Sequence, residues 1–231
     1  HDFAGVAGDG FNVRMISARD EGWTGGIEGV CRPRALLMPS RWHDALTDEE
    51  SMLSIKRRVL AIRTGAWIRG RVAAIGFVIL GAVLAGILTG SNALGTAAGT
   101  IEFSLWYTLW SFLGLLVLPT PSRAAVYRVD EALRAGFTDA AEHSSDAVLL
   151  EHLDTLADDE PSRPAVIEAI FHPIPSVSRR AEGTRANARV PDWWDAARSA
   201  VFMGTAAGSL LGRAVHCNCG RPALWVYLPS P

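Results

Sequence analysis

The sequence has very little lysine and cysteine: Lys56 is its only lysine, and Cys31, Cys217 and Cys219 are its only cysteines. Three cysteines cannot form a disulfide framework, so a small disulfide-stabilised scaffold is excluded and a reducing compartment is favoured. Arginine supplies nearly all of the 22 basic residues, which stand against 24 acidic ones. The net charge of −2 gives no reason to expect nucleic acid as a partner.

The middle of the chain lacks charge. The only charged residue between Arg71 and Arg123 is Glu102, and this stretch divides into two apolar blocks, residues 72–89 and residues 103–118. At about 1.5 Å per helical residue, the first block is long enough to cross a hydrocarbon core of about 30 Å. Lipid offers the backbone no hydrogen-bond partners, so each block is predicted to be a helix. We therefore expect a transmembrane helical hairpin in contact with the lipid bilayer.

Basic residues flank this hairpin on both sides, whereas its loop, residues 90–100, carries no charge. The flanking cations are Lys56, Arg57, Arg58, Arg63, Arg69 and Arg71 before the first block, and Arg123, Arg128 and Arg134 after the second. The positive-inside rule places both flanks in the cytoplasm. We expect a multi-pass protein of the bacterial inner membrane with most of its chain in the cytoplasm. The chain begins at His1 without a recognisable signal peptide, so we expect that its start has been removed or that more protein lies upstream.

The whole chain divides into six predicted segments. The first would form a sheet from strands at residues 11–17 and 35–38. The second opens with a capping box of Thr47 and Glu50, which predicts a helix over residues 48–69 that leads directly into the membrane. The segments are a small cytoplasmic β region (1–45), this helix (46–71), the hairpin (72–118), a cytoplasmic helical region (119–180), a linker (181–192), and a last helix with a strand (193–231).

The region after the hairpin predicts three helices. Ser122 is expected to cap one that continues to residue 135, an amphipathic pattern predicts another over residues 146–158, and Pro164 opens a short third. Residues 176–191 are rich in arginine and are predicted to be a solvated linker.

The last apolar stretch, residues 196–211, is short for a membrane span and contains Arg198 near its start. Trp193 and Trp194, which precede it, suit an interfacial position. We expect a membrane-surface or re-entrant helix, with a third crossing as the less favoured alternative. An alternating strand is predicted at residues 223–228.

The order of these parts resembles the HtpX-type and CAAX-prenyl-protease-type membrane zinc metallopeptidases over about residues 33–180. The shared features are a strand ending in Leu-Met-Pro, an acid-capped helix, a membrane hairpin, a Ser-Arg pair opening the next helix, and a downstream His-Pro with an arginine. In that family the first helix carries His-Glu-x-x-His, and the helix after the hairpin supplies a third zinc ligand. The resemblance implies a mostly helical α+β membrane protein, with the hairpin inserted in a cytoplasmic metallopeptidase-like domain that has a small β-sheet.

Carried over position by position, the resemblance keeps the scaffold residues and loses the zinc ligands. The retained residues are Ser122, Arg123, Tyr127, Asp130, His172 and Arg179. Arg57 and Ala61 stand where the two histidines would be, Arg58 where the catalytic glutamate would be, and Val126 at the third ligand. None of these side chains can donate to zinc, and paired arginines repel a dication. The comparison implies a pseudo-peptidase without a cofactor.

Two further groups of residues are candidate binding residues, one for a metal ion and one for the membrane or a partner protein. His216, Cys217 and Cys219 offer three soft donors within four residues, but a structural zinc site usually draws on two such groups, so they are weak metal candidates. Trp106, Trp110, Trp193 and Trp194 are candidates for contact with the membrane or a partner, and for the first two, packing on the first membrane helix is the favoured interpretation.

The functional prediction is a non-catalytic structural or accessory subunit of a larger membrane complex, with other integral membrane proteins as partners. One alternative is an active zinc peptidase with displaced ligands such as His43, His143 or His172. Another is a quality-control adaptor that binds membrane-protein clients by strand addition at the edge of residues 35–38.

Overall fold

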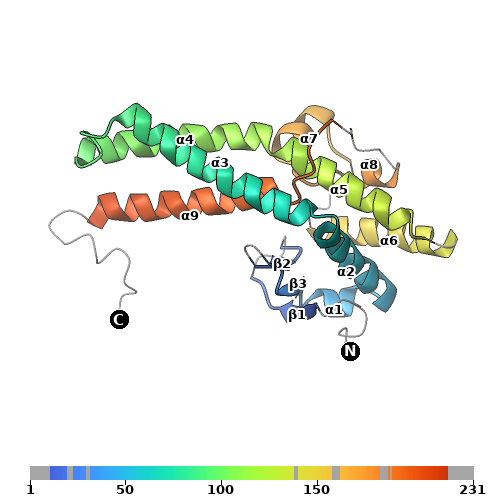
Figure 1. The fold of residues 1–231 in the computed structure, drawn as a ribbon. Coiled ribbons are helices and arrows are strands. Elements are labelled where there is room, and N and C mark those ends of the chain that lie inside the picture. Colours follow the sequence, from blue (N-terminus) through green and yellow to red (C-terminus); the bar gives the residue numbers. More distant parts are fainter. Residues whose placement is uncertain are drawn as a thin grey trace.

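Two long helices extend from a body of shorter helices, and this body also contains a three-stranded sheet (Figure 1). The computed structural model describes residues 11–19, 23–29, 32–137, 140–157, 162–182, 187 and 189–217. Within these residues the molecule is mostly helical with a small sheet, as the sequence predicts.

The sheet is built from β1 (Asn12–Ile16), β2 (Gly26–Glu28) and β3 (Ala35–Pro39) in the order β1-β3-β2. β3 pairs in parallel with β1 and antiparallel with β2. The two predicted strands are therefore confirmed. The expectation of a free edge at residues 35–38 is wrong, because β1 and β2 occupy both sides of β3.

The helix after the sheet, α2 (Asp48–Arg63), begins with the predicted capping box. The Thr47 side chain accepts a hydrogen bond from the backbone N–H of Glu50 at 3.3 Å, and the Glu50 carboxylate accepts one from the Thr47 N–H at 2.8 Å. The helix is shorter than predicted, because Gly65 adopts a left-handed conformation with φ 74°. The chain changes direction at this glycine before α3 (Ala66–Thr89) begins.

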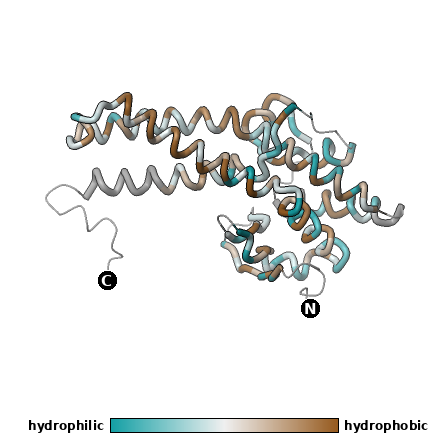
Figure 2. Tube along the Cα trace, in the orientation of Figure 1, coloured by the Kyte–Doolittle hydropathy of each residue, from teal (hydrophilic) through white to brown (hydrophobic). Residues whose placement is uncertain are grey.

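The long pair consists of α3 and α4 (Ala97–Val117). Their 24 and 21 residues correspond to about 36 Å and about 32 Å of helix. Only 22% of the most apolar stretch of α3, and 17% of that in the helical run Ala97–Arg134, is buried, so most of these apolar side chains do not face a core. Hydrophobic residues run along both helices (Figure 2). Both are long and apolar enough to cross a membrane.

The remaining helices are one short helix beside the sheet, four around the base of this pair and one long helix alongside it. They are α1 (Trp42–Ala45), α5 (Pro119–Arg134), α6 (Ala140–Ala157), α7 (Ala165–Phe171), α8 (Val177–Ala181) and α9 (Ala196–Cys217). Ser122 does not cap α5, because that helix begins three residues earlier at Pro119 and places Ser122 inside its first turn. Residues 176–191 are not simply a solvated linker, because they contain α8 and the buried side chain of Arg180.

The last helix, α9, continues to Cys217 and lies alongside α3 and α4 (Figure 1). Its start packs with the bases of the other two helices in a small apolar cluster of Ala74, Leu118, Ala197 and Ala200. The strand predicted at residues 223–228 lies outside the described residues.

The main core lies where the sheet meets α1, α2, α6 and the first turn of α3. Its largest buried members are Leu36, Trp42, Ile55, Trp67 and Leu149. This core holds the sheet, the kink at Gly65 and the base of the hairpin in a fixed relation.

Candidate functional site

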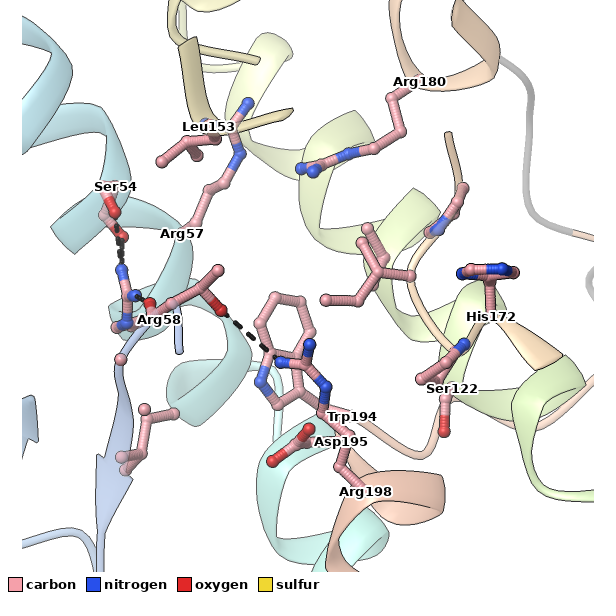
Figure 3. Close-up of a pocket in the computed structure, with 18 of the residues that line it drawn as sticks. Ser54, Arg57, Arg58, Ser122, Leu153, His172, Arg180, Trp194, Asp195 and Arg198 are labelled. Carbon is pink, nitrogen blue, oxygen red and sulfur yellow. Dashed lines mark hydrogen bonds between the residues drawn. The ribbon is translucent and has the colours of Figure 1, made fainter. Parts of the chain in front are cut away.

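A cavity of about 200 Å³ lies at the junction of the sheet and the helices (Figure 3). This is far more than the about 15 Å³ that one water molecule requires. Its walls come from the edge strand β2, from α2, α5 and α6, from the loop before α8, and from the first turns of α3 and α9. Segments far apart in the sequence therefore meet around one space.

Three of the four residues expected at the degenerate site, and two of the six that match the rest of the family pattern, line this cavity. Arg57, Arg58, Ser122, Val126 and His172 are all in its wall. Ala61 is fully buried outside this wall, and the matched residues Arg123, Tyr127, Asp130 and Arg179 also lie outside it. The structure thus brings the positions of the expected metal motif and the His-Pro segment together.

The side chain of Arg57 is 5% exposed and lies in a buried ion-pair network. Its Nε donates to Asp130 Oδ1 at 3.0 Å, and its Nη2 donates to Asp146 Oδ1. Arg180 donates from Nε to Asp130 Oδ2 at 2.7 Å and from Nη2 to Asp130 Oδ1 at 2.9 Å. Arg134 also pairs with Asp146, at 3.2 Å. The network connects α2, α5, α6 and α8.

The network keeps its groups charged although they are buried. Burial favours the neutral form of Asp130, but the charges and hydrogen bonds of Arg180 and Arg57 outweigh this and lower its pKa from 3.8 to about 2. Burial also lowers the pKa of Arg57, and the Asp130 and Asp146 carboxylates oppose that shift. Two buried cations are thus balanced by two buried anions.

A second group of arginines in the wall has no carboxylate partner within ion-pair distance among the described residues. Arg58 donates from Nη1 to the Ser54 side chain at 2.6 Å and from Nη2 to the backbone oxygen of Thr24 at 2.6 Å, and it lies over the Trp42 ring. Burial, and then the charge of Arg57, lower the pKa of Arg58 to about 10. Its charge therefore remains at neutral pH. Its hydrogen bonds in the described structure go to neutral groups, and Asp195 acts on it only at longer range.

Arg71 and Arg198 complete this second group. Arg71 donates to the Ser199 hydroxyl at 2.8 Å and lies over the Trp67 ring, with its centre 5.7 Å from the ring centroid. Its Nε is buried without a hydrogen-bond partner in the described structure. Arg198 is exposed and makes a 3.4 Å contact with the Thr24 hydroxyl.

Asp195 is the one acidic residue among those described that line the cavity. Its φ of 59° is in the left-handed region, where Asp and Asn are tolerated better than most residues. Burial raises its pKa, although Arg198, Arg71 and Arg58 act in the opposite direction. Figure 3 shows it between Trp194 and Arg198. The cavity is therefore strongly cationic with one carboxyl group in its wall.

The candidate metal ligands do not converge. His43 pairs with Asp44 at 2.9 Å beside a second, smaller cavity, His143 stacks edge-on against Phe137, and His172 lies in the main cavity. No group of three His, Cys, Asp or Glu residues in the described part of the chain could hold a metal ion. His216 and Cys217 lie at the end of α9, and Cys219 lies outside the described residues.

The retained motif residues of α5 connect it to its neighbours. Ser122 Oγ accepts a hydrogen bond from the backbone N–H of Ala197 at 3.1 Å, which fixes the start of α9. Arg123 donates to the backbone oxygens of Glu168, Ala169 and His172 at 2.7 to 2.9 Å and so caps the end of α7. Arg179 pairs with Glu168 at 3.6 Å, and Tyr127 is half-buried in α5. These contacts are structural.

The tryptophans of α4 differ in their surroundings. Trp110 stacks on Phe77 of α3 at a centroid distance of 4.7 Å and donates to the Phe77 backbone oxygen at 2.9 Å, as expected for packing on the first helix. Trp106 is 37% exposed on the outer surface.

The tryptophans before α9 turn toward the body of the chain. Trp193 packs against the small apolar cluster at the base of the hairpin, and its N–H donates to the Pro121 oxygen. Trp194 packs against the main core and donates to the Ala66 oxygen.

Sequence reasoning did not identify Arg71, Arg198, Asp195 or Trp67 as members of one site. The sequence did contain a signal for the two arginines, because each stands where an apolar helix begins. They are more than a hundred residues apart, so the sequence alone did not indicate that they lie in one site. Guanidinium groups donate hydrogen bonds and bind anions, but they neither ligate zinc nor act as bases near neutral pH. Comparisons of the chain with protein-family models, curated proteins and solved structures gave no match.

Proposed function

We propose that this chain is a membrane-anchored, non-catalytic relative of the HtpX-type metallopeptidases that serves as a structural or accessory subunit of a membrane protein complex. One observation supports the proposal: the guanidinium of Arg57, which the resemblance aligns with the first zinc histidine, is buried and held by Asp130 and Asp146. Replacing a ligand by a paired cation removes the affinity for a dication and with it the activation of water. A chain of this kind would keep its fold and the surfaces through which it contacts partner proteins.

The membrane placement is supported by the exposed apolar side chains of the hairpin. They include Val72, Ile79, Leu80, Val83, Ile87 and Leu88 on α3, and Ile101, Leu105, Leu109, Phe112, Leu116 and Val117 on α4. In water these surfaces would favour aggregation, whereas lipid or a partner helix would cover them. With the flanking arginines inside, the sheet and the cavity lie on the cytoplasmic side of a bacterial inner membrane.

The course of α9 bears on its place in that membrane. It lies along α3 and α4 rather than across them, so a hairpin that crosses the bilayer carries α9 into the bilayer beside it. This favours the re-entrant or third-crossing arrangement over a helix flat on the surface.

A second candidate function is an adaptor for membrane-protein clients. It is favoured by the position of β2, which is an edge strand whose residues Gly26 and Ile27 line the cavity. An extended segment could add to this edge. The active-peptidase alternative has less support, because His43, His143 and His172 lie at three separate places.

The test is purification of the full chain from its native membrane in a mild detergent, with zinc and co-purifying proteins measured on the same sample. We expect far less than one zinc per chain and a partner set of fixed stoichiometry. Stoichiometric zinc that is lost in His172→Ala but kept in His43→Ala would overturn the non-catalytic assignment. Many clients at variable ratios, in place of a fixed set, would favour the adaptor.

A further inference from the structure

The charge of the cavity wall is far from balanced. Six arginines line it, at positions 57, 58, 71, 163, 180 and 198, against the single carboxylate of Asp195 among the described lining residues. Asp130 and Asp146 lie behind the wall and are engaged by Arg57, Arg180 and Arg134. An excess of positive charge in a recess of low dielectric attracts anions strongly.

Two of these arginines have buried nitrogen atoms without a partner. Arg57 Nη1 and Arg71 Nε are inaccessible to solvent and make no hydrogen bond within the described structure. The Arg57 residue as a whole is 95% buried. Buried polar atoms are usually satisfied, so these two N–H groups represent donor capacity in the arginines of the wall that no acceptor in the described structure uses. Arg58 offers a third cation without a carboxylate partner.

The cavity also lies at the level where the hairpin leaves the domain. Arg71 is the last residue before the uncharged stretch of α3, and Arg198 is in the first turn of α9, which continues along that stretch. Trp67 and Trp194 line the same wall. Arginines and tryptophans at this height are the groups that meet lipid head groups at a membrane interface.

We propose that this cavity binds the phosphate group of an anionic membrane lipid. Arg58, Arg71 and Arg198 contact the phosphate oxygens, while Trp67 and Trp194 cover the glycerol and the first methylene groups. Arginine suits this task because its planar fork matches the oxygens of a phosphate. The assignment of the phosphate to a membrane lipid rests on the membrane placement proposed above. Asp195 opposes binding and balances the arginines when the cavity is empty.

The experiment uses the full chain in dodecyl maltoside and native mass spectrometry with two lipids that have the same acyl chains. We expect dioleoylphosphatidylglycerol to form a one-to-one adduct at about a tenfold lower concentration than dioleoylphosphatidylcholine. Both lipids carry the same phosphodiester, but the choline cation of the second lipid cancels its charge and is repelled by the arginines, and about 1.4 kcal/mol of difference corresponds to this factor. Inorganic phosphate is titrated separately as the soluble form of the same chemistry.

Four variants decide the site. Arg71→Gln and Arg198→Gln should each weaken the phosphatidylglycerol adduct about tenfold. Arg69→Gln removes the same charge from an exposed residue of α3 that is outside the cavity wall, and should bind like the unaltered chain. Asp195→Asn should bind several-fold more tightly. A gain of affinity cannot arise from misfolding, and Arg198 is exposed, so these variants remain informative if Arg71→Gln is unstable.

The outcomes are separable. Equal adducts with both lipids, or equal loss in Arg69→Gln and Arg198→Gln, would overturn the proposal. Binding of inorganic phosphate at the arginines without a phosphatidylglycerol adduct would overturn the lipid and assign a soluble phosphate ester. Zinc content and partner stoichiometry are read from the same preparation, so failure of the lipid site and failure of the subunit role give different results.

Discussion

Removing the carboxylate of Asp130 should strongly destabilise the domain. Its side chain is 2% exposed and accepts three hydrogen bonds, one from Arg57 and two from Arg180. In Asp130→Ala, Arg57 keeps Asp146, but Arg180 loses the only carboxylate within ion-pair distance in the described structure. Removing one partner of a buried ion pair typically costs about 3–5 kcal/mol. We expect a decrease of this size in the free energy of unfolding.

The assay is urea unfolding of the full chain in detergent, followed by tryptophan fluorescence. Trp42 and Trp67 are 1% and 2% exposed in the main core, so their emission reports its opening. The matched control is Asp44→Ala, whose side chain is 92% exposed and should change stability by less than about 0.5 kcal/mol. If Asp130→Ala unfolds at the same urea concentration as Asp44→Ala, the network does not hold the domain together.

Acid should reproduce part of this loss. The folded pKa of Asp130, about 2, lies below its ordinary value of 3.8, so its contribution is complete above about pH 4 and is lost as the pH falls toward 2. The difference corresponds to about 2 kcal/mol. Asp130→Asn imitates the protonated form and should lose a similar amount at neutral pH, with a flatter dependence on pH below 4. An unchanged acid profile in this variant would contradict the assignment.

Three further predictions test the network and the hairpin. Replacing the three residues around Asp130 by apolar ones, in Arg57→Met with Asp130→Leu and Arg180→Met, leaves Asp146 paired with Arg134 and should restore most of the stability lost in Asp130→Ala, as measured by the same urea assay. Gly81→Ala should lower the thermal midpoint by about 5 °C, because the new methyl group would overlap the Trp110 ring, whereas Gly76→Ala meets no atom within 4 Å and should be neutral. With the native cysteines replaced, Ser91→Cys in the α3–α4 turn should react with an impermeant maleimide added outside intact cells, and Ser144→Cys only after lysis; the reverse pattern would invert the topology.

Much of the fold follows from local signals. Apolar length predicts the two long helices, and the capping box predicts the start of α2, because both depend on residues close in sequence. The break at Gly65 was missed because a single glycine inside an apolar pattern is tolerated in many helices, and the sequence does not show that this glycine adopts a left-handed φ. Ser122 has the residue type of a cap, yet its hydroxyl is used by α9, which is 75 residues away.

The site was harder to predict than the fold. The resemblance placed Arg57, Arg58 and Val126 at related positions, and these three line one cavity. The chemistry of that cavity could not be predicted from composition, because it depends on which arginines pair with carboxylates. Arg57 and Arg180 both pair with Asp130, which is 73 residues from Arg57 and 50 residues from Arg180 in the sequence. Residues 176–191 were predicted to be solvated because they are rich in arginine, and the sequence does not show that Arg180 pairs with a distant carboxylate.

The ion-pair network joins three helices through buried charges, at the positions where the resembled peptidases would join them through a metal ion. A bound dication joins the elements that supply its ligands, and its removal leaves repelling groups or a void at the centre. Arg57 places a cation at the same centre and satisfies it with Asp130 and Asp146, so α2, α5 and α6 remain connected through charge. A guanidinium has no empty orbital for water or a carbonyl oxygen, so it connects these helices without supplying a Lewis acid. Arg58, Arg71 and Arg198, which have no carboxylate within ion-pair distance in the described structure, are the part of this wall that the proposed anion would contact.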